Sequence, residues 1–98
     1  MINVPEVWLK FGLNMYQDIF AEYEDFDGVV LAVLEALNDS EKSELFAFID
    51  NTLRGNPSNQ YLIDLWVKSG ASDVLVSEHM PIVYEVILKA IDGSLKNK

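Results

Sequence analysis

The densest group of side chains that could bind an ion or a partner lies near the N-terminus, in residues 15–28. These fourteen residues contain five carboxylates, four aromatic rings and no Lys or Arg. Carboxylates can hold a cation or attract a basic partner, and Tyr rings supply contact area in protein interfaces. Tyr23 lies between Glu22 and Glu24, which favours an outward position as much as a core position. We therefore expect a recognition surface here.

One alternative for these acids is a calcium loop. Asp25 and Asp27 alternate ahead of Gly28, as acids do before the obligatory glycine of such a loop. Aligning on that glycine places Tyr23 at the first ligand position and Leu34 at the last, where a bidentate Glu is needed. Two essential oxygens are missing, so we expect the acids to cap a helix and expect no metal site.

Catalytic chemistry has no supporting pattern elsewhere in the chain. His79 is the single histidine and the chain has no cysteine, so neither a metal pair nor a nucleophilic thiol is available. His79 shortly precedes Pro81 and is expected to be a solvated loop residue. We find no glycine-rich phosphate loop and no serine in a nucleophile setting. The sequence therefore predicts a protein that is not an enzyme and needs no cofactor.

The charge is strongly negative and unevenly distributed. Sixteen acids against seven Lys and Arg give a net charge of −9, and residues 1–50 hold eleven of the acids with two lysines, Lys10 and Lys42. Such a field repels phosphate backbones, so we expect no nucleic-acid binding and a basic protein partner. The alternative is that the acidity serves solubility alone.

Two further absences concern the location of the protein. The N-terminus lacks the basic region and apolar run of a secretory signal. No apolar run approaches the roughly 20 residues needed to span a bilayer. We therefore expect a cytoplasmic protein without a membrane association.

Apolar residues at helical spacing predict the elements that position the acids. A first helix is expected from Pro5 to about Gln17, with an apolar stripe that includes Trp8, Leu9 and Leu13, followed by a loop within residues 22–27. A second helix should be capped by Asp25 or Asp27. Its core positions are expected to be Val29, Val30, Val33, Leu34 and Leu37, with Leu31 and Ala32 partly buried.

Three more helices follow in the second half of the chain. They are expected to begin at Ser40, Ser58 and Pro81, and to end near Arg54, near Ser69 and at Gly93. Residues 71–80 read as an extended connector or a single turn. The inner faces should carry Leu45, Phe46, Ile49 and Leu53; Tyr61, Leu62, Leu65 and Trp66; and Ile82, Val83, Val86, Ile87, Ala90 and Ile91. Residues 1–98 are therefore predicted to form one all-α domain, an orthogonal bundle of four to five helices.

One part of this order resembles a known family. The run Met15-Tyr-Gln-Asp-Ile19 follows a short amphipathic helix and precedes an Asp-rich connector and the apolar helix over residues 29–37. This arrangement, continued by the helix from Ser40 and a helix containing Leu65 and Trp66, resembles small immunity proteins of bacterial contact-dependent growth inhibition systems. The resemblance implies a helical protein that binds and neutralises a cognate toxin domain, commonly a nuclease, without catalysis.

The negative charge agrees with that implication, because a nuclease has a basic groove that clustered carboxylates can occupy. The alternative is a small helical adaptor or regulatory module that docks through its apolar helices, its acidity serving solubility. The residues expected to contact the partner are Asp18, Glu22, Tyr23, Glu24, Asp25 and Asp27, with Glu41 and Glu44 nearby.

Overall fold

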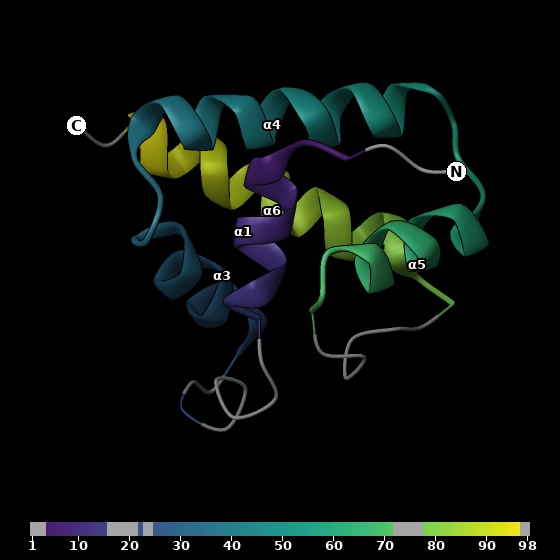
Figure 1. Ribbon diagram of the computed structural model, residues 1–98, viewed down its shortest axis with the longest axis horizontal. Helices are drawn as coiled ribbons and strands as arrows, with labels where there is room; N and C mark the ends of the chain where they lie inside the picture. The colour runs from purple at the N-terminus through teal and green to yellow at the C-terminus, as the bar shows by residue number, and fades with distance from the viewer. Residues whose placement is uncertain (1–3, 16–21, 23–24, 72–77, 97–98) are drawn as a thin grey trace.

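The computed structural model shows a bundle of helices (Figure 1). It describes residues 4–15, 22, 25–71 and 78–96. Within those residues the helices are α1 (Glu6–Leu13), α3 (Phe26–Leu34), α4 (Asp39–Arg54), α5 (Asn59–Lys68) and α6 (Met80–Lys96). The Cα radius of gyration of 12.4 Å is close to the roughly 13 Å expected for one domain of this length. The predicted all-α, single-domain bundle is confirmed.

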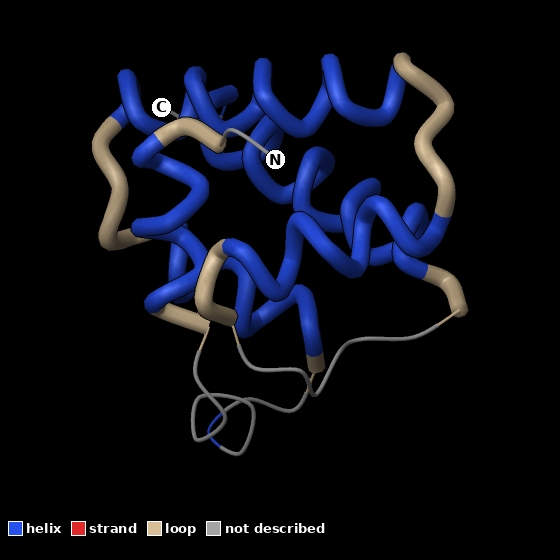
Figure 2. Tube along the Cα trace, turned by 45° about the vertical axis from the view of Figure 1, so that its right-hand side comes forward, coloured by secondary structure: helices blue, strands red, loops and turns tan. Residues whose placement is uncertain are grey.

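Only helices and loops occur in the described ranges (Figure 2). Most of the connector expected over residues 71–80 lies in 72–77, outside the described part of the chain. None of the described helices is long and apolar enough to cross a membrane.

Side-chain caps decide where the central helices begin. Asp25 accepts the Gly28 amide at 2.8 Å and caps α3, and Ser58 accepts the Tyr61 amide at 3.1 Å and caps α5. Both caps are the residues predicted from the sequence. The expected Ser40 cap of α4 is wrong, because Asn38 accepts the Glu41 amide at 2.8 Å and the Glu41 side chain accepts the Asn38 amide at 3.0 Å. This reciprocal capping box satisfies two helix-end donors at once.

The first helix is shorter than predicted and turns a different face to the core. It ends at Leu13, because Asn14 donates its side-chain amide to the Lys10 carbonyl at 2.8 Å and so satisfies an acceptor in the last turn. Trp8 and Phe11 are fully buried, whereas Leu13 is 70% exposed. The expected stripe through Leu9 and Leu13 is therefore wrong for Leu13. Two overlapping apolar stripes are possible at this spacing, and packing selects the one that carries both large rings.

The last helix continues past its predicted end. Gly93 lies inside α6, which runs to Lys96, and Lys96 pairs with Asp92 at 3.0 Å across one turn. Its buried positions are Met80, Tyr84, Ile87 and Ile91. Ile82, expected on the inner face, is 59% exposed. Tyr61 was also expected on an inner face and is 42% exposed, whereas Leu31, expected to be partly buried, is 49% exposed.

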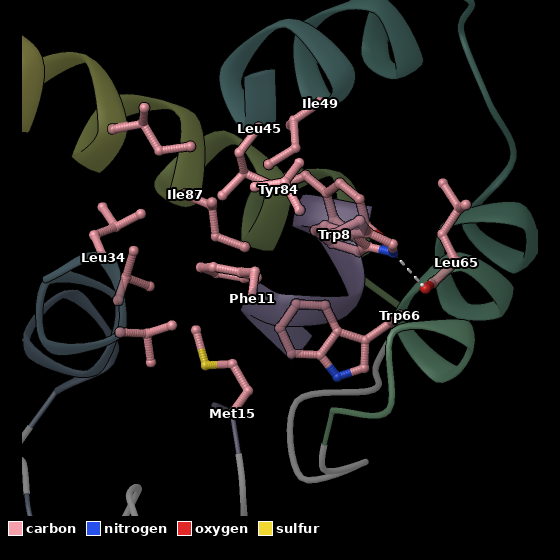
Figure 3. Close-up of a cluster of buried hydrophobic side chains, with 14 of the residues drawn as sticks. Trp8, Phe11, Met15, Leu34, Leu45, Ile49, Leu65, Trp66, Tyr84 and Ile87 are labelled. Carbon is pink, nitrogen blue, oxygen red and sulfur yellow. Dashed lines mark hydrogen bonds between the residues drawn. The ribbon is translucent and has the colours of Figure 1, made fainter. Parts of the chain in front are cut away.

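Trp8 lies at the centre of the core (Figure 3). Its ring centroid is 5.4 Å from that of Phe48, 5.6 Å from that of Tyr84 and 6.1 Å from that of Trp66. Its indole N–H donates to the Leu65 carbonyl at 2.8 Å, which satisfies its buried polar atom. The ring of one α1 residue thus contacts residues of α4, α5 and α6.

Candidate functional site

An ion pair joins α1 to the N-terminal turn of α4. Lys10 Nζ donates to Glu41 Oε2 at 2.8 Å, while Glu41 Oε1 accepts the Asn38 amide in the capping box. Both hydrogen bonds lower the pKa of Glu41 below its ordinary value of 4.5, and the bond from Lys10 has the larger effect. One carboxylate therefore both caps α4 and ties α1 to it.

A hollow of about 630 Å³ lies beside this ion pair, between α1 and α4. Its lining consists of Glu6, Val7, Leu9, Lys10, Leu13, Glu41 and Glu44. The apolar part includes Leu13, whose side chain is exposed because it points away from the core. Exposed apolar surface with a polar rim is typical of interaction sites.

The rim of this hollow is negative. Lys10 is matched by Glu41, so that pair contributes no net charge. Glu6 and Glu44 are exposed, and neither forms an ion pair with another described residue. The hollow therefore combines apolar contact area with two uncompensated carboxylates, which is a suitable surface for an apolar side chain flanked by Lys or Arg.

The structure brings some of the predicted contact residues together and separates others. Glu41 and Glu44 line the hollow, as just described. Asp25 is exposed and holds the α3 cap, and Glu22 is exposed. Asp27 lines a different hollow, between α3 and α6. Asp18, Tyr23 and Glu24 lie outside the described residues.

Two residues that line this hollow are not among the contact residues predicted from the sequence: Glu6, and Leu13, which is exposed. Glu6, Lys10 and Leu13 follow one another at spacings of four and three residues, which places them on one helix face. That spacing was a usable signal for Glu6. The spacing of apolar residues predicts a core position for Leu13, and its exposure follows only from the way α1 packs in the folded chain.

Two further candidates have defined structural positions. Asp25 Oδ1 accepts the Gly28 amide, so the capping role expected for these acids is confirmed at this residue. His79 is exposed, and its backbone carbonyl accepts the Ile82 amide at 3.1 Å at the start of α6. Across the described ranges, no group of three His, Cys, Asp or Glu residues could hold a metal ion.

In comparisons with known proteins, no family model, curated protein or solved structure matches this chain.

We expect the Glu41 ion pair to make stability depend on pH. The pKa of Glu41 is lower in the folded state than its ordinary value of 4.5. The ion pair therefore stabilises the fold fully at a pH above 4.5, and this stabilisation is lost as the pH falls through the folded-state pKa of Glu41. Glu41→Gln keeps a capping-box side chain but removes the charge. It should lower the Tm by a few degrees at pH 7, and this difference should shrink toward zero in acid.

Thermal unfolding followed by circular dichroism between pH 3 and 7 would measure this effect. Glu44→Gln is the matched control, because it removes a charge from the same hollow without breaking an ion pair between described residues. A Tm difference for Glu41→Gln that stays constant across the range would contradict the assignment.

Proposed function

We propose that this chain is an immunity protein that binds and neutralises a cognate bacterial toxin domain, commonly a nuclease, in the cytoplasm and without catalysis. The observation that carries the proposal is the hollow between α1 and α4, where exposed Leu13 adjoins the uncompensated carboxylates of Glu6 and Glu44. The net charge of −9 and the resemblance of residues 15–19 to an element of such proteins support it.

The proposed mechanism is occlusion of a basic surface. An apolar toxin side chain would pack on Leu13, and flanking Lys or Arg side chains would meet Glu6 and Glu44. Because both rim carboxylates are exposed, they would act mainly on the association rate and on its salt dependence. A toxin groove filled in this way can no longer accept the phosphates of a nucleic acid.

The test is binding to, and protection against, the product of the adjacent upstream gene. We expect the double variant Glu6→Gln with Glu44→Gln to raise the Kd about tenfold at low salt, which corresponds to a loss of about 1.4 kcal/mol of binding free energy. The matched control is Glu78→Gln with Glu85→Gln, two exposed acids outside the hollow. Both double variants change the net charge from −9 to −7.

The expected result is a larger loss for the hollow variant than for the control, with the difference disappearing at high salt. Cells that make the toxin should grow when they also make the wild-type chain. Full toxicity in the presence of soluble wild-type chain would remove the proposal. Equal binding by both double variants and the wild type would instead favour an adaptor whose acidity serves solubility.

A further inference from the structure

A second surface groove follows α3 and the C-terminal half of α6, away from the hollow between α1 and α4. It consists of two hollows of about 440 and 410 Å³ that share Leu31, Lys89 and Ala90. One hollow extends to Asp27 and the other to Glu35. Asp27 lies in the first turn of α3 and Glu35 is its C-cap residue, eight residues later, or about 12 Å along a helix. The groove is therefore long enough for two turns of another helix.

Gly93, in the wall of this groove, has no packing reason to be glycine. Glycine weakens a helix interior, and it is found where a backbone or ligand must come close. At Gly12 the reason lies within the chain, because an added Cβ would overlap Ser69. At Gly93 an added Cβ would meet nothing within 4 Å. The absence of a side chain at Gly93 leaves room for something outside the described chain.

The charges along the groove alternate. Asp27 and Glu35 lie toward its two ends and Lys89 lies between them. None of the three forms an ion pair with another described residue. Leu31 lies on α3 between these two acids in the sequence and is 49% exposed.

We propose that this groove docks an amphipathic helix of a partner protein. The docked face carries small and apolar residues, with Lys or Arg two turns apart to meet Asp27 and Glu35 and an acid between them to meet Lys89. An apolar groove with charged ends binds helices in this way. A second copy of the chain fits less well, because each copy carries a net charge of −9. The proposal does not depend on the toxin-binding function.

The test uses the full chain labelled with ¹⁵N and a synthetic helical peptide of about four turns. The peptide has Leu and Ala on one face, Lys two turns apart and Glu between them. We expect chemical-shift changes to concentrate at Leu31, Ala90 and Gly93. A peptide with the charges reversed should bind at least tenfold more weakly.

Gly93→Leu fills the groove and should weaken peptide binding at least tenfold while leaving the Tm unchanged or higher, since the added side chain starts in open space. Ser43→Leu is the control, because it adds the same side chain at an exposed position of α4 outside both hollows. Equal binding by Gly93→Leu, or shifts centred elsewhere, would overturn the proposal. A dimer of the wild type that Gly93→Leu dissociates would also overturn it, by making a second copy the occupant.

Discussion

Gly12→Ala is expected to lower the free energy of unfolding by about 2–4 kcal/mol, a severe effect for the addition of one methyl group. Gly12 is buried in α1 against Ser69, the C-cap residue of α5. An added Cβ would overlap the Cβ, Oγ and carbonyl oxygen of Ser69. Two of those atoms cannot move without moving the backbone, so α1 and α5 would have to separate.

Ser69 is also held in place by its own hydrogen bonds. It is 2% exposed, its hydroxyl donates to the Trp66 carbonyl at 2.6 Å, and the same oxygen accepts the Ala71 amide at 3.2 Å. A rotamer change would break both bonds. Overpacking at this contact is therefore relieved only by displacing a helix.

Urea denaturation would measure the loss, with Gly93→Ala as the matched control. The control makes the same substitution in a helix interior where a Cβ meets open space, so it should raise stability by about 0.5–1 kcal/mol through helix propensity. A Gly12→Ala midpoint equal to that of the wild type would show that α1 and α5 do not approach as closely as described.

Trp8→Ala is expected to cost about 3–5 kcal/mol, a large part of the 5–15 kcal/mol typical of a small domain. The ring is fully buried and contacts aromatic residues of three other helices. Its removal leaves a cavity that those helices cannot close without losing their contacts with one another. The Leu65 carbonyl would also lose the hydrogen bond that it accepts from the indole N–H at 2.8 Å.

Leu13→Ala is the matched control for Trp8→Ala, because it removes a large apolar side chain from the same helix at a 70% exposed position. It should change stability by less than about 0.5 kcal/mol. Thermal and urea unfolding of both variants would measure the contrast. Comparable losses in the two variants would mean that α1 presents a different face to the core.

Local features of the sequence were sufficient to predict several helix boundaries, although not the end of α1, the start of α4 or the end of α6. Asp25 and Ser58 cap their helices as expected, and α4 ends at Arg54 before Gly55. Capping depends on hydrogen bonds over three residues, so its signals are contained in short segments. The burial of Val29, Val30, Val33 and Leu34 on α3, and of Leu37 just after it, was also predictable, because this segment is apolar on nearly every side.

The candidate site was predictable only in part. Glu41 and Glu44 were identified by their charge, but the pairing of Glu41 with Lys10, 31 residues away, was not. The exposure of Leu13 and the position of Glu6 beside Glu44 depend on how α1 lies against α4. Asp27, grouped with these acids by sequence, instead lines the groove between α3 and α6.

The sequence by itself determined that this chain is helical, where α3 and α5 begin, and that its charge is negative. The tertiary structure alone decided which stripe of α1 is buried and which acids share a hollow. It also decided that Gly12 is packed against Ser69 while Gly93 faces open space. Helix formation and capping are interactions between near neighbours, whereas a hollow or a close helix contact forms between residues that only packing brings together.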